Sequence, residues 1–195
     1  KWLKTEIWPK IKSELPETQL HVYGAYLPQQ VLELHKEKEG FLIKGRAMAV
    51  DDVMQTAKVC LAPLRFGAGI KGKLISAMQN GTPSVTTNIG AEGMLWDLHW
   101  SGNIANDSVN LANAAITLYK NKTDWKKAQK QGFEIISAYY SKSKLKVKLL
   151  SKIEVLCNNL LHHRTQNFIG ALLQYQNMMS TKYMGKWIEE KNKKT

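Results

Sequence analysis

The chain has 195 residues, with 28 lysines and arginines against 16 aspartates and glutamates, and a formal net charge of +12. This length supports one hydrophobic core without covalent staples, which excludes a disulfide-stabilised miniprotein. No run of about 18 apolar residues occurs, so the sequence contains no membrane-spanning helix. Cys60 and Cys157 lie far apart, and Cys60 falls in an apolar run where a small buried side chain is expected. We therefore expect a soluble, reduced, cytoplasmic protein.

The positive charge comes almost wholly from lysine. Only three of the basic residues are arginines, whereas proteins that recognise base edges depend on arginine. Ten lysines lie between residues 120 and 152, against Asp124 and Glu134. This segment fits either a solvated helix face or peripheral contact with an anionic membrane, at the inner face of the cytoplasmic membrane. No specific nucleic acid partner is expected.

The hydrophobic pattern predicts short helices that alternate with short apolar strands. In chain order we expect a helix over 1–13, a strand over 18–24, a helix over 28–37, a strand over 40–45, a helix over 51–57, a strand over 58–63, a helix over 71–80, a strand over 83–87, a strand within 103–107, and a helix from Asn106 or Asp107 to about residue 119. Strands that are apolar throughout are typical of a parallel sheet with both faces covered. The sequence therefore predicts a doubly wound α/β domain, Rossmann-like, over residues 1–122. Residues 123–195 show helical patterns alone and are expected to form C-terminal helices that pack on this domain.

The segment GAGIKGK, residues 67–73, partly matches two phosphate-binding motifs. Gly67, Gly69 and Gly72 give the dinucleotide pattern G-x-G-x-x-G, and Gly67, Gly72 and Lys73 give the Walker pattern G-x-x-x-x-G-K. The dinucleotide motif belongs in the first strand-to-helix turn, with an acidic residue at the end of the next strand, and this loop meets neither condition. The Walker motif needs Ser or Thr after its lysine, where this chain has Leu74. Neither nucleotide motif is complete.

The physical features that the two motifs share still predict an anion-binding loop. Glycines let backbone amides approach an anion, a helix N-terminus adds partial positive charge, and lysine adds a full charge. On the helix that follows, Lys73, Ser76 and Asn80 form a polar stripe, whereas Leu74 and Met78 form an apolar one. We expect the loop to hold a phosphate or diphosphate without a metal ion or other cofactor, and Ser76 to reach a hydroxyl-rich part of the ligand. A close-packed turn that binds nothing is the alternative.

Residues 60–94, CLAPLRFGAGIKGKLISAMQNGTPSVTTNIGAEGM, closely resemble the donor-binding half of bacterial group 1, family 4-like retaining glycosyltransferases of the GT-B fold. The upstream segments LHVYGAY, GFLIKGR and VDDVMQTAKVCLAPL match the same family in order, so the resemblance covers residues 15–140. It implies a nucleotide-sugar donor, a glycan or lipid-linked acceptor, and a separate N-terminal acceptor domain towards which the C-terminal helices return. It also implies that the first strand of the donor domain lies outside this chain, which we expect to be inactive alone.

The resemblance also implies the roles of individual residues. It assigns the donor diphosphate to Gly67, Ala68, Gly69, Ile70 and Lys71. It places the sugar, ribose or base near Ser76, Lys73, Arg46 and Glu92. Ala68 and Ser76 stand where the family usually has two glutamates, so sugar recognition departs from the common pattern. No catalytic residue is assigned, because retaining members of this fold generally use the donor's own phosphate oxygen.

Two alternatives remain open at this point. A sugar-nucleotide epimerase of the same fold would use a similar diphosphate pocket. A non-catalytic basic module would instead bind nucleic acid or an anionic membrane through the lysines of residues 120–152. Binding of uridine or guanosine diphosphate that depends on Lys71 distinguishes the enzyme hypotheses from the basic module.

Overall fold

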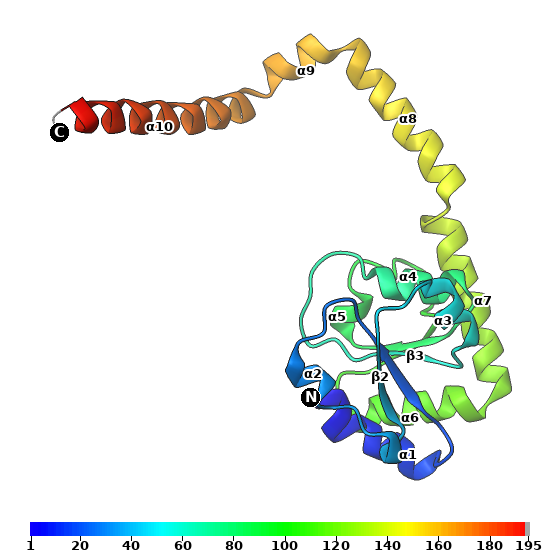
Figure 1. Cartoon of the computed structure of the whole chain (residues 1–195). Helices are drawn as coiled ribbons and strands as arrows, with labels where there is room; N and C mark the ends of the chain where they lie inside the picture. The colour runs from blue at the N-terminus through cyan, green and yellow to red at the C-terminus, as the bar shows by residue number, and fades with distance from the viewer. Residues whose placement is uncertain (194–195) are drawn as a thin grey trace. The chain divides into compact units, whose positions relative to one another are not determined.

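The computed structural model describes residues 1–193, without the side chains of residues 176–178. The chain forms two compact units, Lys1–Ser141 and Lys142–Thr195 (Figure 1). The first unit contains parallel strands and helices, and the second contains helices in its described part, which confirms the predicted fold class. Helix α7 (Lys122–Tyr139), which the sequence assigned to the C-terminal extension, belongs to the first unit. The functional division at residue 122 stays a prediction.

Parallel strands form two separate sheets in the first unit. Strands β1 (Leu20–Tyr23) and β2 (Phe41–Gly45) make one sheet, with Leu20 opposite Phe41. The other sheet has the order β3-β4-β5, formed by β3 (Cys60–Ala62), β4 (Ser84–Thr86) and β5 (Gly102–Ile104). The sequence predicted these strands and their parallel direction, but it predicted one sheet, and in residues 1–193 no strand ladder joins β1 to β3.

Helices cover both faces of the three-stranded sheet. Figure 1 shows β3 between α4 (Gly72–Gln79) on one side and α6 (Ser108–Lys120) with α1 (Trp8–Glu14) on the other. The remaining helical elements of this unit are η1 (Leu3–Ile7), α2 (Gln29–Leu32), η2 (Glu37–Glu39), α3 (Val50–Thr56), α5 (Asn88–Ala91) and α7. The helix expected over residues 28–37 is shorter than predicted: α2 ends at Leu32, and η2 covers Glu37–Glu39, just before β2 begins at Phe41.

Two hydrophobic clusters lie on the two sides of this sheet. One joins α1 and α6 with β4 through buried side chains that include Ile7, Trp8, Val85 and Leu111. The other joins α4 to α7 through side chains that include Leu74, Met78, Met94, Trp100 and Ile135. Because large apolar side chains of each cluster are fully buried, we expect replacement of one of them by alanine to lower the free energy of unfolding by about 2 to 5 kcal/mol. The second cluster fixes α4, and the glycine-rich loop leads directly into the first turn of this helix.

Cys60 lies beside the second cluster and is half-buried. Burial raises the pKa of its thiol to about 11, and this effect outweighs the opposing attraction of the thiolate to Lys73. The thiol is therefore protonated at neutral pH and acts as a small apolar group, as the sequence predicted for Cys60.

Side chains cap the N-termini of both long helices of the first unit. Asp107 Oδ1 accepts hydrogen bonds from Val109 N at 3.1 Å and Asn110 N at 2.9 Å, at the start of α6. Asn121 Oδ1 accepts from Thr123 N at 2.9 Å and from Asp124 N at 3.2 Å, at the start of α7. Of the two residues that the sequence offered as the α6 cap, Asp107 is the one that caps the helix.

The carboxylate cap makes a pH-dependent contribution to stability that we expect Asp107→Ala to remove. Hydrogen bonds from Asn110 hold the pKa of Asp107 below its ordinary value of 3.8, so its contribution is present above pH 3.8 and is lost as the pH falls through the lowered pKa. The free energy of unfolding, measured in urea, should therefore differ between wild type and Asp107→Ala at neutral pH and converge in acid. Asn121→Ala removes an uncharged cap, and its effect should not change with pH. Equal pH dependence of the two losses would contradict this assignment.

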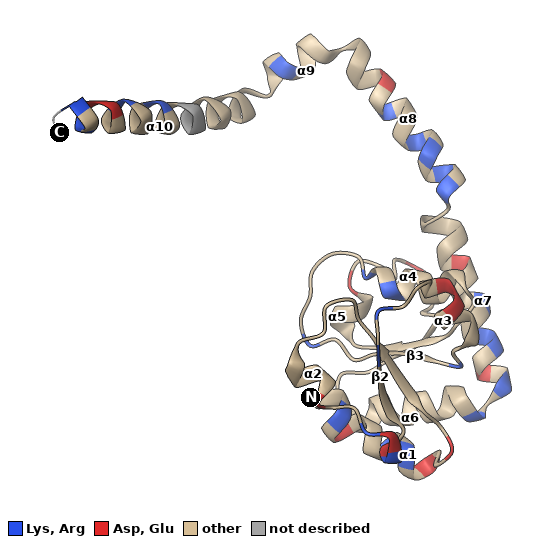
Figure 2. Cartoon of the chain, in the orientation of Figure 1, with Lys and Arg blue, Asp and Glu red and all other residues tan. Residues whose placement is uncertain are grey.

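The second unit consists, in its described part, of α8 (Lys142–Asn158), α9 (Leu160–Gln166) and α10 (Phe168–Lys193). Figure 2 shows lysines repeating along α8, which buries none of its side chains. Leu149, Ile153, Tyr183 and Trp187 are among the exposed apolar side chains of this unit. No helix among the described residues is both long enough and apolar enough to cross a membrane.

Candidate functional site

The candidate site is the glycine loop, residues 65–71, which connects β3 to α4. Gly67 has φ +149° and Gly69 has φ +66°, backbone conformations that side chains with a Cβ rarely adopt. A Cβ at Gly69 would have no heavy atom within 4 Å, so packing does not demand glycine there. Glycine is required at these positions because of the positive φ angles. The lack of side chains there also leaves the amides of the loop accessible.

Lys71 is the buried charged residue at the end of this loop. It is 7% exposed, and its Nζ is buried with no hydrogen-bond partner among the described residues. A Cβ at Gly67 would lie 3.8 Å from Lys71 Cε, so the loop folds back over the lysine side chain. A buried ammonium without a hydrogen-bonded counter-charge is unfavourable. The loop therefore holds a positive charge that an anion would stabilise.

The N-terminus of α4 adds further donors next to Lys71. The amides of Leu74 and Ile75 donate to Lys71 O at 2.9 Å and 3.3 Å, which leaves the amides of Gly72 and Lys73, ahead of them, without a helical acceptor. The helix dipole places partial positive charge at this end. Free amides, the dipole and the buried ammonium lie together at this end of the loop, and anion binding there stays a prediction.

The two faces of α4 differ as the sequence predicted. Leu74, Ala77 and Met78 are fully buried in the core, whereas Lys73 is exposed and Ser76 is half-buried. Asn80, the third residue of the polar stripe, is used elsewhere. Its side chain donates to Asp51 Oδ1 at 2.8 Å and accepts from Gln55 Nε2 at 2.9 Å, so that it fastens α3 to α4.

Arg46 and Glu92 are not joined by a hydrogen bond or ion pair to another predicted site residue within residues 1–193. Arg46 is exposed directly after β2, and Glu92 is exposed directly after α5. Ala68 and Ile70 are exposed within the glycine loop. The structure brings Gly67 and Lys71 together, whereas the roles of Arg46, Lys73, Ser76 and Glu92 stay predictions.

Two threonines at the end of β4 were missed by the sequence analysis, which treated PSVTT as a strand alone. Thr86 Oγ1 donates to Ala62 O at 2.7 Å, and Thr87 Oγ1 donates to Leu64 O, next to the glycine loop. Both threonines are buried. The sequence did contain a signal for these contacts. Two consecutive threonines at the carboxyl end of a buried strand indicate hydroxyl groups that can bond to the end of the adjacent strand.

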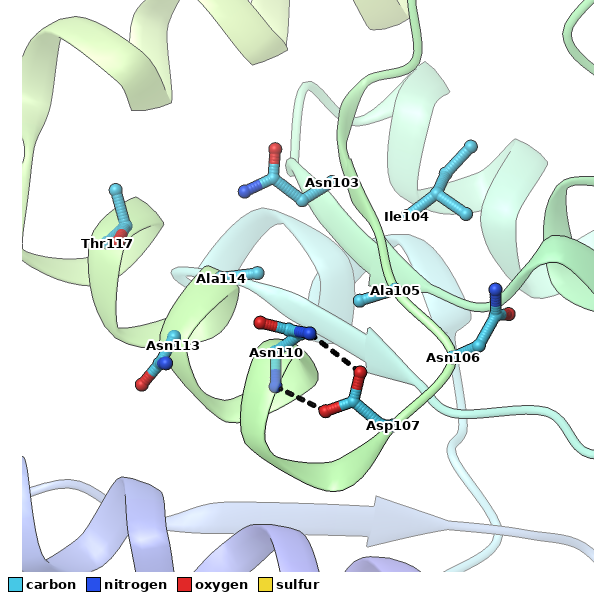
Figure 3. A pocket seen from close by; sticks show the side chains of 9 residues that line it. All are labelled: Asn103, Ile104, Ala105, Asn106, Asp107, Asn110, Asn113, Ala114 and Thr117. Atoms are coloured by element: carbon cyan, nitrogen blue, oxygen red, sulfur yellow. Dashed lines mark hydrogen bonds between the residues drawn. The ribbon is translucent and has the colours of Figure 1, made fainter.

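A hollow of about 560 Å³ lies away from the glycine loop, beside β5 and α6 (Figure 3). Its lining is mostly polar, and it comprises Asn103, Ile104, Ala105, Asn106, Asp107, Asn110, Asn113, Ala114 and Thr117. Figure 3 shows Asp107 turned towards Asn110, whose Nδ2 donates to Asp107 Oδ2 at 2.7 Å. The acidic residue of this hollow is thus occupied in capping α6, and no predicted site residue lines it.

The lysines of residues 120–152 are divided between the two units. Those up to Lys130 lie on α6 and α7, and those from Lys142 lie on α8. Within the first unit, Lys120 pairs with Glu14 at 3.0 Å and Lys130 with Glu134 at 4.0 Å. Among residues 1–193 no group of three His, Cys, Asp or Glu side chains is placed to hold a metal ion.

The fold and the site together define a Rossmann-like α/β domain with a glycine-rich loop and a buried lysine after its third strand. Residues 1–121 match the family model described as glycosyl transferases group 1. The chain therefore belongs to the group 1 glycosyltransferase family, which confirms the resemblance drawn from residues 60–94. No curated protein sequence matches the chain.

Solved structures of two bacterial glycosyltransferases share the fold. The chain is 17% identical to a variant of TarM from S. aureus, solved with fondaparinux, alpha-GlcNAc-glycerol and UDP, with a TM-score of 0.65 over 76% of this chain. It is 19% identical to the pneumococcal O-GlcNAc transferase GtfA, solved with UDP and GlcNAc, with a TM-score of 0.63 over 80% of this chain. The matches cover 31% and 33% of those proteins, so the chain spans about a third of their length.

Proposed function

We propose that this chain is the donor-binding domain of a retaining glycosyltransferase that moves a sugar from a nucleotide diphosphate to a glycan or lipid-linked acceptor. The observation that carries the proposal is the buried ammonium of Lys71, which has no hydrogen-bond partner among the described residues. A diphosphate supplies both the missing counter-charge and acceptors for the amides of residues 67–73. Family membership and the UDP named with both structural neighbours support a nucleotide-sugar as its source.

The same groups would act on the leaving group of the reaction. When the bond from the sugar to the diphosphate breaks, negative charge grows on the phosphate oxygen. Fixed amides at the start of α4 and the Lys71 ammonium would stabilise that charge without further reorganisation. Ser76, one turn further along α4 and half-buried, is the candidate contact with the sugar or ribose.

The split sheet supports an additional strand supplied by another part of the protein. In a doubly wound fold with the order 3-2-1-4-5-6, the first strand lies between the second and the fourth. The order observed here, β2-β1 and β3-β4-β5, matches that sequence with a gap between β1 and β3. We propose that a parallel strand fills this gap and that a separate acceptor domain completes the transferase.

Nucleotide titration tests the proposed binding site directly. Calorimetry on the full chain should show saturable binding of UDP or GDP, whereas uridine, which has no phosphate, should bind at least about tenfold more weakly. A variant with Lys142, Lys146 and Lys148 changed to glutamine serves as the control, because these lysines of α8 lie in the other unit. It should bind UDP as the wild type does. Binding only to heparin or to phosphatidylglycerol vesicles, lost with salt and in the α8 variant, would contradict the proposal and favour a basic module.

A further inference from the structure

We propose that Thr87 is a positioning residue for the glycine loop, through the hydrogen bond from its hydroxyl to Leu64 O. Thr87 is 4% exposed, and Leu64 directly precedes the loop. The same hydroxyl accepts a hydrogen bond from Gly90 N at 3.2 Å, where it caps α5. One hydroxyl therefore joins the end of β4, the start of the glycine loop and the N-terminus of α5. The effect of this contact on nucleotide binding rests on the proposed function.

The neighbouring threonine reinforces the same segment. Thr86 Oγ1 donates to Ala62 O at 2.7 Å, and that carbonyl also accepts from Leu64 N at 2.9 Å. The chain thus turns sharply as β3 ends, with both Ala62 and Leu64 fastened to β4. Because β4 is buried along its whole length, these contacts start from a rigid element.

The glycine loop itself has few other restraints. No hydrogen bond of the described structure involves residues 65–70, and these residues are exposed. Arg65 lies over the ring of Trp2, with 5.7 Å from the guanidinium carbon to the ring centroid. The loop is therefore held mainly at its two ends, by Leu64 and by Lys71.

A shift of Leu64 would be transmitted to the amides that face Lys71. Binding groups that are held in place before the ligand arrives lose less entropy when it binds. Without the Thr87 hydroxyl, the carbonyl of Leu64 and the amide of Gly90 would both lose a partner. The loop would then sample positions in which its amides and the Lys71 ammonium no longer converge on one anion.

The test compares Thr87→Val with a matched variant, Thr82→Val, in the full chain. Thr82 is also buried and also donates its hydroxyl to a carbonyl, Met54 O at 2.6 Å, but that carbonyl belongs to α3 and not to the loop. Melting temperature, UDP affinity and the NMR backbone order parameters of residues 65–70 are measured for both variants. Thr87→Ser, which keeps the hydroxyl, is the rescue variant.

We expect Thr87→Val to weaken UDP binding about tenfold more than Thr82→Val does. The order parameters of residues 65–70 should fall in Thr87→Val alone, because the loop becomes more mobile, and Thr87→Ser should restore both quantities. If Thr87→Val does not fold, Thr87→Ala replaces it, because alanine has no γ-methyl group to press against Leu64 O.

The outcomes separate this inference from the proposed function. Unchanged loop order parameters in Thr87→Val overturn the positioning role, whatever the nucleotide result. Equal losses of affinity in Thr87→Val and Thr82→Val also overturn it, because the effect would then follow stability alone. Failure of the wild type to bind UDP or GDP overturns the proposed function instead, and the order parameters still decide whether Thr87 holds the loop.

Discussion

Replacing Lys71 with methionine should raise the stability of the protein and abolish its nucleotide binding. Methionine has similar length but removes a buried ammonium without a hydrogen-bond partner, so we expect the free energy of unfolding to rise by about 1 to 2 kcal/mol. For a chain of this size that corresponds to a melting temperature higher by about 2 to 8 °C. The affinity for UDP should fall at least about 100-fold, because the diphosphate loses its buried charged partner.

A gain in stability together with a loss of UDP affinity distinguishes a lysine that binds a ligand from one that stabilises the fold. A lysine that stabilises the fold would lower both stability and binding when replaced. Lys10→Met is the matched control, because Lys10 is exposed on α1 and its replacement changes the net charge by the same amount. It should alter neither the melting temperature nor the UDP affinity appreciably. A Lys71→Met protein that melts at a lower temperature and still binds UDP would refute the assignment of Lys71.

Replacing Gly102 with alanine should strongly destabilise the first unit. Gly102 has φ +131°, and a Cβ there would lie 2.0 Å from Ser84 O on the neighbouring strand. Backbone oxygen cannot move aside without breaking the pairing of β4 with β5, in which Gly102 lies opposite Ser84. We expect the melting temperature to fall by at least about 10 °C, or the protein to accumulate unfolded.

Gly93→Ala separates the steric effect from backbone strain. Gly93 has φ +70°, but a Cβ there would meet no atom within 4 Å. Its substitution should therefore cost only the left-handed conformation, about 1 to 2 kcal/mol. Near-equal melting temperatures for Gly93→Ala and Gly102→Ala would show that β4 and β5 do not approach as closely as the structure places them.

Sequence periodicity predicted the strands and the two faces of α4 because those features depend on local patterns. Leu74, Ala77 and Met78 recur at helical spacing and are all fully buried. β4 is buried along its whole length, and each ladder between the strands is parallel, as predicted. The glycine loop was predicted from residue types whose chemistry is independent of the rest of the fold.

The difference in burial between Lys71 and Lys73 could not be predicted from the sequence. Both lysines stand at the start of α4, but the loop folds back over Lys71 only, while Lys73 is exposed. The use of Asn80 to hold α3 also depends on a contact between segments about 29 residues apart in the chain. Such contacts are tertiary, and the helical spacing that identified the polar stripe contains no information about them.

The absence of buried side chains in α8 has a consequence for how the molecule unfolds. Helices without a packed face are held by local propensity and charge pairs, and they melt gradually, whereas a packed core melts in one cooperative step. Buried Trp8 and Trp100 lie in that core, so their fluorescence should report a sharp transition. Helical circular dichroism should decline before it, and the calorimetric enthalpy should correspond to the first unit rather than to the whole chain.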